Sequence, residues 1–186
     1  MRYKDDVYDR LWSAYGDSNI WKPLGTNVSD GQFINKNKYQ LPFTVMRTAY
    51  TDNNESDMIL TWHQHQLNST SEYFLVIHLS ELERLQKSQF REFDIYVNEN
   101  LWYGPLVPSY LETISIFSTN GTKVDSEGKF QVSFNPTKNS TLAPLINAME
   151  IYILKELSLQ ETNQTQGTYM YVDLRNLFLV LNFLIS

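Results

Sequence analysis

The sequence predicts an all-β fold, an antiparallel sandwich with one or two short helices. Three observations lead to this prediction: apolar and polar residues alternate in short runs, loops rich in Asn, Ser, Thr, Gly and Pro separate these runs, and few segments have helical spacing. Several short strands at such spacing are typical of a sandwich. With 186 residues, the chain is long enough for one domain with a substantial core.

Seven segments are expected to be strands, because each is short, apolar on at least one face and bounded by turn residues. In chain order they are residues 43–48, 58–62, 73–79, 92–97, 112–117, 129–134 and 148–154. Segment 73–79 is apolar on both faces, which indicates a central strand. Residues 8–12 and 81–89 are expected to be short helices.

The segment from Arg91 to Pro105 combines a strand, a turn and two aromatic residues. Residues 92–97 alternate as a half-buried strand does, and 98–100 have turn chemistry, because Asn tolerates positive φ. Trp102 and Tyr103 follow directly. From spacing alone, these two aromatic residues either line a ligand site or cap the end of the core.

Composition excludes several classes of function. The net charge of −6 and the lack of a basic stripe with interleaved aromatics argue against a nucleic-acid partner. There is no cysteine, so disulfides, thiolate metal sites and Cys nucleophiles are excluded. The acidity is most simply a solubility property.

Asn-x-Ser/Thr sequons are more frequent than chance predicts. Six of the 16 asparagines begin such a motif, against about 2.6 expected from the Ser and Thr content of the chain. The candidate N-glycosylation sites are Asn27, Asn54, Asn68, Asn120, Asn139 and Asn163. This excess favours passage through the secretory route.

The two ends of the chain differ in hydrophobicity. Residues 1–12, MRYKDDVYDRLW, have no apolar export signal, so the chain is expected to be a fragment of a longer secreted or membrane-anchored protein. Residues 177–185 are apolar but too short to span a bilayer, which takes about 20 residues as a helix. They are a last strand, a poorly packed tail, or sequence foreign to the domain.

No constellation of residues predicts a cofactor, a metal or catalysis. His63 and His65 would share one face of a strand, but zinc usually needs three or four ligands. The scattered carboxylates are expected on solvated faces and in loop caps; they are Asp5, Asp6, Asp9, Glu81 and Glu83. No nucleophile elbow, phosphate loop or kinase signature is present.

Four motifs in this order resemble the second malectin-like lobe of plant leucine-rich-repeat receptor-like kinases. They are DDVYDRLW at residues 5–12, YFLVIHLSELERL at 73–85, REFDIYVNENLWYGP at 91–105 and NSTLAPLINAMEIYIL at 139–154. The resemblance implies a malectin-like antiparallel β-sandwich of jelly-roll type. It covers residues 1–162 as one domain of a larger ectodomain, whereas 163–186 form an atypical tail that is not expected to be native domain sequence.

The resemblance also implies a function. The chain is expected to be a noncatalytic ligand-binding lobe on the extracellular side of the plasma membrane, within a single-pass receptor whose kinase is not in this chain. Expected partners are a cell-wall carbohydrate or a peptide, the neighbouring malectin-like lobe and a co-receptor. The alternative is a structural or dimerisation lobe with no ligand site of its own. A jelly-roll enzyme acting on glycosides is a third alternative.

The chain departs from the animal malectin pattern at positions that matter for ligands. Glu83 and Arg84 stand where malectin has an aromatic pair, and Leu142 stands where it has an Asp. Glycan binding in the malectin manner is therefore not expected. The candidate ligand contacts are Trp102, Tyr103, Glu83 and Arg84.

The turn at residues 98–100 is a second departure. Most relatives have Asn-Gly where this chain has Asn98-Glu99. Either Glu99 or Asn100 is therefore expected to take the strained turn geometry.

Overall fold

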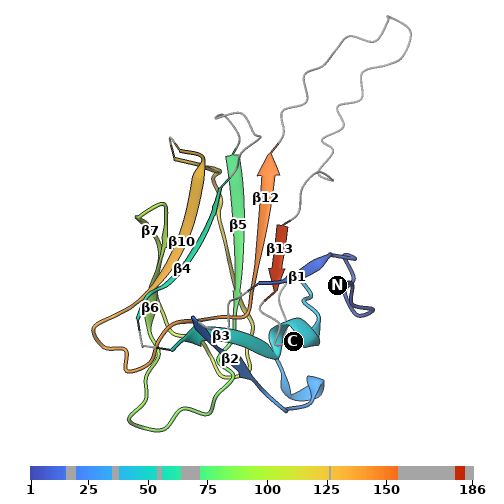
Figure 1. Ribbon diagram of the computed structural model, residues 1–186. Helices are drawn as coiled ribbons and strands as arrows, with labels where there is room; N and C mark the ends of the chain where they lie inside the picture. Colours follow the sequence, from blue (N-terminus) through green and yellow to red (C-terminus); the bar gives the residue numbers. More distant parts are fainter. Residues whose placement is uncertain are drawn as a thin grey trace, which may run out of the picture.

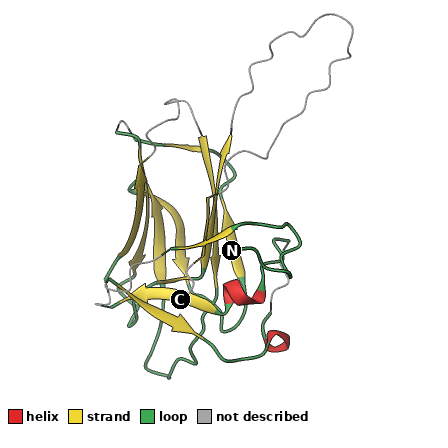
Figure 2. Ribbon diagram, turned by 45° about the vertical axis from the view of Figure 1, so that its right-hand side comes forward, coloured by secondary structure: helices red, strands yellow, loops and turns green. Residues whose placement is uncertain are grey.

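The protein is a β-sandwich in which two sheets pack face to face (Figures 1 and 2). The computed structural model describes residues 1–15, 20–34, 38–53, 56–63, 72–125, 127–154 and 179–182. A third, smaller sheet crosses one end of the sandwich, shown at the bottom of Figure 1. This confirms the predicted all-β class.

One layer is a six-stranded sheet in which the predicted central strand, β5, lies between β12 and β8. Its path is β1 (Trp12–Ala14), β13 (Leu179–Asn182), β12 (Ala148–Leu154), β5 (Glu72–Leu79) and β8 (Ile114–Phe117), and β9 (Thr122–Lys123) also pairs with β5. All pairs are antiparallel except β1 with β13. Side chains of β5 are buried along most of its length, as a strand covered on both faces requires.

The other layer is a four-stranded antiparallel sheet. Its order is β4 (Met58–His63), β10 (Lys129–Pro136), β6 (Phe93–Val97) and β7 (Asn100–Leu106). Phe130, Val132 and Phe134 of β10 are fully buried, so the period-two pattern of the sequence does mark the face toward the core. The hairpin β6–β7 forms one edge of this sheet.

A three-stranded sheet and two short helices close one end of the sandwich. The strands are β11 (Leu145–Ile146), β3 (Thr48–Asp52) and β2 (Trp21–Gly25), and the helices are α1 (Phe43–Met46) and the 3-10 helix η1 (Asp30–Gln32). Val45 and Met46 of α1 are buried, so the helix contributes to the core.

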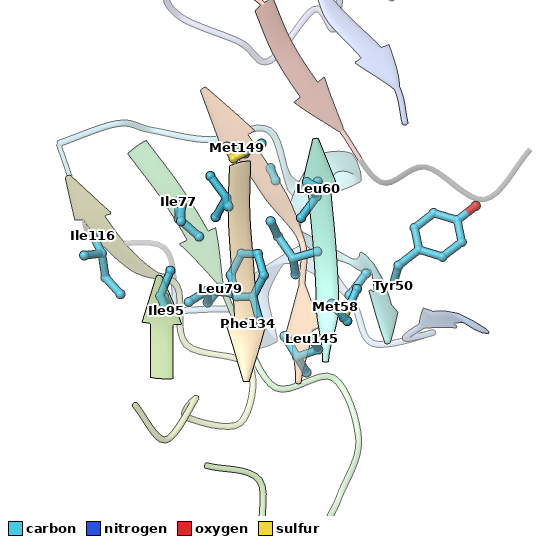
Figure 3. Close-up of a cluster of buried hydrophobic side chains, with 14 of the residues drawn as sticks. Tyr50, Met58, Leu60, Ile77, Leu79, Ile95, Ile116, Phe134, Leu145 and Met149 are labelled. Carbon is cyan, nitrogen blue, oxygen red and sulfur yellow. The ribbon is translucent and has the colours of Figure 1, made fainter. Parts of the chain in front are cut away.

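The core lies between the two large sheets and extends under the small one (Figure 3). Ile77 and Met149 from one layer and Ile95, Phe134 and Leu60 from the other are fully buried. Because side chains alternate along a strand, each sheet has an outer face as well.

The two outer faces differ in what covers them. The N-terminal segment, residues 1–12, packs on the six-stranded sheet through Asp6, Arg10 and Trp12, all of which are buried. No described segment lies over the outer face of the four-stranded sheet, seen on the left of Figures 1 and 2. Ile59 and Leu101 on β4 and β7 are 50% and 60% exposed.

Six of the seven predicted strands are confirmed, with ends that differ by up to two residues: β4, β5, β6, β8, β10 and β12. The prediction for residues 43–48 is wrong. This run forms α1 (Phe43–Met46), and β3 begins only at Thr48. Pro42 directly precedes the helix, where its lack of a backbone N–H costs no helical hydrogen bond. Phe33 packs edge-on against Phe43, with ring centroids 5.8 Å apart.

Neither predicted helix forms. Residues 8–12 are turn and strand, because Arg10 and Trp12 are held by Asp6 rather than by helical backbone bonds. Residues 81–89 are a loop anchored by a β-bridge between Glu81 and Tyr110. Strands β1, β2, β3, β7, β9 and β11 were not predicted. Of these, β1, β9 and β11 have only two or three residues, too few for an alternating pattern to show.

Residues 177–185 contain β13 (Leu179–Asn182), which pairs with β1 and β12. Of the three alternatives for residues 177–185, the structure therefore supports a last strand, at Leu179–Asn182. The boundary at residue 162 falls outside the described residues and stays a prediction.

Candidate functional site

The hairpin β6–β7 turns through Asn98 and Glu99, which have φ of 46° and 66°. Positive φ at both central residues is the two-residue turn whose twist suits a hairpin. Glu99 thus takes the strained geometry that the sequence led us to expect at either Glu99 or Asn100. It does so at a position where Gly is usual.

Asn98 joins this turn to two other strands. Its Nδ2 donates to the carbonyl of Lys123 at 2.8 Å, and its Oδ1 accepts from the backbone N–H of Gln131 at 2.9 Å. The first bond reaches β9 of the opposite sheet and the second reaches β10. The hairpin tip is therefore fixed beside residues 122–123, across the end of the sandwich.

An open cavity of about 340 Å³ lies between the hairpin and β9. Its lining residues are Val97, Asn98, Asn100, Leu101, Trp102, Thr122 and Lys123. The wall is mainly apolar, with amide, hydroxyl and ammonium groups at its edges. Small-ligand sites have this volume and this mixture of groups.

Trp102 enters the cavity wall because of a β-bulge. Tyr96 pairs with Leu101 and Ile95 pairs with Tyr103, so Trp102 is the extra residue between them. A bulge redirects the side chain of the extra residue. Trp102 is half-buried, packs on the core and is also one of the residues that line the cavity. It therefore serves the fold and remains available for contact.

Tyr103 does not line this cavity. It is 43% exposed and stands opposite Ile95, next to Gly104. Gly104 has φ of 148°, and a Cβ there would lie 2.2 Å from Oδ1 of Asp94. The two aromatic candidates thus differ in position: Trp102 lines this cavity and Tyr103 does not.

Glu83 and Arg84 lie at the opposite end of β6 from the hairpin tip. Glu83 Oε2 is 3.1 Å from Nη2 of Arg91, which precedes β6, whereas Trp102 follows the turn. Five residues of strand span about 16 Å. The four candidate contacts therefore do not form one site: Glu83 and Arg84 lie beyond the start of β6, Tyr103 lies opposite its middle residue, and Trp102 lines the cavity beside the hairpin tip.

Arg84 is exposed and meets Tyr110. Its Nε donates to the Tyr110 hydroxyl at 3.2 Å, and its guanidinium carbon lies 5.2 Å from the ring centroid. Leu142 is half-buried and lies next to Ala143, whose carbonyl accepts from Arg91.

Two carboxylates expected in solvent are instead buried. Glu81 Oε2 is 2.7 Å from Nε of Arg91, and both side chains are almost fully buried. Asp6 accepts from Arg10 and, at 2.6 Å, from the indole N–H of Trp12. The expectation of solvated faces is wrong for both, because the partner side chains Arg91, Arg10 and Trp12 enclose them. The expectation of loop caps is confirmed: Asp6 accepts from the backbone N–H of Tyr8 at 3.1 Å, and Glu81 accepts from that of Glu83 at 3.0 Å.

A buried polar cluster lies between the N-terminal segment and β12. Arg10 Nη1 is 2.8 Å from Oε1 of Glu150, and Nε2 of His78 is 2.8 Å from the same oxygen. The His78 Nδ1 pairs with the Ser115 hydroxyl at 2.8 Å, and the Tyr152 hydroxyl donates to Glu150.

Charge and burial oppose each other in this cluster. Burial lowers the pKa of His78, and Arg10 lowers it further, although Glu150 opposes both. Burial alone would raise the pKa of Glu150, but His78, Arg10 and the Tyr152 hydroxyl together hold it below its usual range. These groups bind one another, and none lines the Trp102 cavity, so the cluster is structural.

Other expectations concern metals and membranes. Among the described residues, no three His, Asp or Glu side chains come together as metal ligands. His63 ends β4, whereas His65 lies outside the described residues. In the same part of the chain, no helix has the length and apolarity to cross a membrane.

Three of the six sequon asparagines are described, and all three are exposed: Asn27, Asn120 and Asn139. Asn54, Asn68 and Asn163 lie outside the described residues. The exposed positions are compatible with glycan attachment, which requires a surface site.

Sequence reasoning identified Trp102 but missed Thr122 and Lys123. These two residues lie about 20 positions away and carry no local motif. Only the pairing of β9 with β5 and the Asn98 bond bring them to the hairpin.

The comparisons with known proteins agree with this architecture. The family model of the malectin-like domain matches residues 1–154. The LRR receptor-like serine/threonine-protein kinase IOS1 of Arabidopsis thaliana is 36% identical over 165 residues, which cover 89% of this chain. Another leucine-rich-repeat receptor-like kinase of the same plant is 36% identical over 163 residues, or 88% of this chain. The chain spans 18% of the length of each relative.

Solved structures show the same fold. The ANX2 ectodomain from Arabidopsis thaliana matches with a TM-score of 0.58 and 15% identity, over 76% of this chain and 42% of that one. A complex of the plant peptide RALF23 with FER and LLG2 matches with a TM-score of 0.61 and 18% identity, over 80% and 44%. The family match over residues 1–154 and the homology to receptor-like kinases lead to one conclusion: the chain belongs to the malectin-like domain family.

Proposed function

We propose that this chain is a noncatalytic, extracellular ligand-binding lobe of a plant receptor-like kinase, and that the ligand contacts the cavity beside Trp102. The ligand is a cell-wall carbohydrate or a peptide. The observation that carries the proposal is the cavity itself, whose lining residues include Trp102 together with the polar residues Asn98, Asn100, Thr122 and Lys123.

The chemistry of this lining suits both ligand classes. An indole face packs on the apolar face of a sugar ring or on an apolar side chain. Both ends of the Asn98 amide and the Nδ2 of Asn100 are bonded within the protein, so the hydrogen bonds to a ligand would come from the Thr122 hydroxyl and the Asn100 Oδ1. Lys123 adds a positive charge. Lys123 is exposed, and among the described residues no carboxylate lies within ion-pair distance of it.

The comparisons support the wider setting. The relatives are receptor-like kinases, and the matched structures include an ectodomain and a complex of a peptide with FER and LLG2. The chain covers 42% of the ANX2 ectodomain chain, as one of two lobes would. We therefore place it on the extracellular side of the plasma membrane, beside a second malectin-like lobe and a co-receptor.

Titration of the secreted domain with wall oligosaccharides and with peptides tests the proposal, with calorimetry as the readout. For a ligand that binds, Trp102→Ala should weaken affinity about 10-fold or more, because truncating a packed aromatic anchor costs about 2 kcal/mol. Tyr103→Ala and Arg84→Ala are matched controls outside the cavity and should leave affinity within about twofold.

Two outcomes would contradict the proposal. If no oligosaccharide or peptide binds saturably, the chain is not a direct sensor. If Arg84→Ala abolishes binding while Trp102→Ala does not, the ligand site lies at the other end of the sandwich.

A second candidate function is a structural or dimerisation lobe. The observation in its favour is the uncovered face of the four-stranded sheet, where Ile59, Ser133, Tyr96 and Leu101 form one row in register across all four strands. The residues at the two ends of this row, Ile59 and Leu101, have exposed apolar side chains. Light scattering after size exclusion should then show a dimer that Ile59→Lys dissociates. A strict monomer that binds a sugar at a defined site would contradict this second candidate.

A further inference from the structure

The sequon at Asn120 is built into the edge of the Trp102 cavity. Asn120 is exposed, and Thr122, the third residue of this sequon, lines the cavity. Two residues of chain span at most about 7 Å, so the Asn120 backbone lies within that distance of the lining. Of the three sequons described, only this one shares a residue with the cavity.

The segment that carries Asn120 is held in place on both sides. A Cβ at Gly121 would lie 2.5 Å from Cβ of Glu72, so the chain passes close against β5 at this point. Thr122 and Lys123 pair with Tyr73 and Glu72. Because the Asn98 side chain also binds the Lys123 carbonyl, the sequon and the indole keep a fixed relation.

The lining suits the first sugar of an N-linked glycan. N-acetylglucosamine has an apolar ring face, hydroxyl groups and one acetamide. Trp102 is half-buried and lines the cavity, and an indole provides a flat apolar surface for such a ring face. Asn98, Asn100 and Thr122 are among the other lining residues. A glycan on Asn120 is tethered beside this surface, so its local concentration there is high without any free ligand.

We propose that the N-glycan on Asn120 folds back onto Trp102 and covers the mouth of the cavity. The occupant is the innermost N-acetylglucosamine of the chain's own glycan, and it excludes ligands supplied in trans. That the glycan excludes ligands rests on the proposed function, because it assumes that ligands bind in this cavity. That the sugar packs on the indole does not, because it requires only that the chain is secreted and glycosylated.

The test uses the secreted, glycosylated domain, with occupancy of Asn120 measured by mass spectrometry of its glycopeptide. Acrylamide quenching reports the accessibility of Trp102, isolated as the difference from a Trp102→Phe background. Asn120→Gln should increase this quenching. Asn139→Gln is the matched control, because Asn139 is an exposed sequon that lies near Glu92 and Thr137, at the other end of β6, and it should change nothing.

Enzymatic trimming to a single N-acetylglucosamine separates the inner sugar from the rest of the glycan. If the inner sugar is the occupant, the trimmed protein should keep the protection of Trp102. Loss of protection on trimming would overturn the assignment. So would equal quenching in wild type and Asn120→Gln with Asn120 occupied, or an Asn120 that carries no glycan after secretion. Equal circular dichroism and melting temperature exclude a folding effect of the variant.

Ligand affinity then distinguishes the two proposals. If the glycan covers the cavity about nine-tenths of the time, Asn120→Gln should bind a trans ligand about 10-fold more tightly. Unchanged affinity in Asn120→Gln, together with weak binding by Trp102→Ala, would overturn the covering role and leave the ligand site intact. Increased quenching without any trans ligand would support the sugar on the indole and contradict the proposed function alone.

Discussion

At the scale of single residues, two positions are determined by what surrounds them. Gly104 has φ of 148° and lies against Asp94, so any side chain there meets both backbone strain and a clash. Arg91 is buried and pairs with Glu81 at 2.7 Å, so each charge depends on the other. Both residues belong to the segment from Arg91 to Pro105.

Gly104→Ala should destabilise the domain by about 1–3 kcal/mol, the usual cost of a residue forced into a disfavoured backbone region. Gly31→Ala is the matched control, because a Cβ at Gly31 meets nothing within 4 Å. Urea denaturation of the two variants measures the difference. Equal free energies of unfolding would show that the hairpin relaxes around residue 104.

Arg91→Met should reduce the free energy of unfolding by about 3–5 kcal/mol, because it leaves the Glu81 carboxylate buried without its partner. Arg84→Gln, seven residues earlier and exposed, should cost less than about 1 kcal/mol. Chemical denaturation compares them. A small loss in Arg91→Met would mean that water or Glu81 protonation replaces the ion pair.

At the scale of elements, the N-terminal segment is joined to the six-stranded sheet through buried charges. Arg10 binds Asp6 beside it in sequence and Glu150 on β12 at the same time. His78 on β5 binds the same carboxylate. The attachment of residues 1–12 therefore depends on the protonation of groups from three elements.

Stability should fall as the pH is lowered below about 6.5, the ordinary pKa of histidine. Burial lowers the pKa of His78, so the unfolded chain takes up a proton on this residue at a higher pH than the folded one does. Stability then decreases as pH falls through that window. The lowered pKa of Glu150 acts in the same direction below about 4.5.

His78→Gln should flatten the loss of stability between pH 7 and 5, because it removes the group that takes up the proton. Urea denaturation at both pH values in wild type and variant measures the slope. The groups around His78 are Glu150, Arg10, Ser115 and Tyr39. An unchanged slope would assign the pH dependence to other residues.

The sequence predicted strands correctly where one face of the strand is buried. It failed where tertiary contacts determine the local conformation. Residues 129–134 alternate because only one face meets the core, so sequence alone revealed strand β10. Residues 43–48 are also apolar, but they fill a corner beside Phe33 as a short helix. Residues 81–89 have helical spacing, yet the burial of Glu81 against Arg91 holds them as a loop.

At the scale of the whole molecule, the described residues cover the outer face of the six-stranded sheet but not that of the four-stranded sheet, and the three described sequons lie in different loops. Asn27 follows β2, Asn120 lies between β8 and β9, and Asn139 follows β10. Glycans on these three asparagines would be attached to three different loops.

A chain passed through a secretory pathway should carry glycans on Asn27, Asn120 and Asn139, because all three are exposed and glycans require surface positions. Glycopeptide mass spectrometry, before and after enzymatic removal of N-glycans, checks each site. Secreted protein that is unmodified at all three asparagines would argue that the sequon excess is compositional.

Local patterns in the sequence are enough to predict the fold class, six of the strands, the hairpin turn at Asn98-Glu99 and the resemblance to malectin-like lobes. The cavity that Trp102 shares with Thr122 and Lys123, and its separation from Glu83 and Arg84, follow from the tertiary structure. The reason is physical: a bulge in β7 and the pairing of β9 with β5 depend on register between strands, which alternation within one strand does not specify.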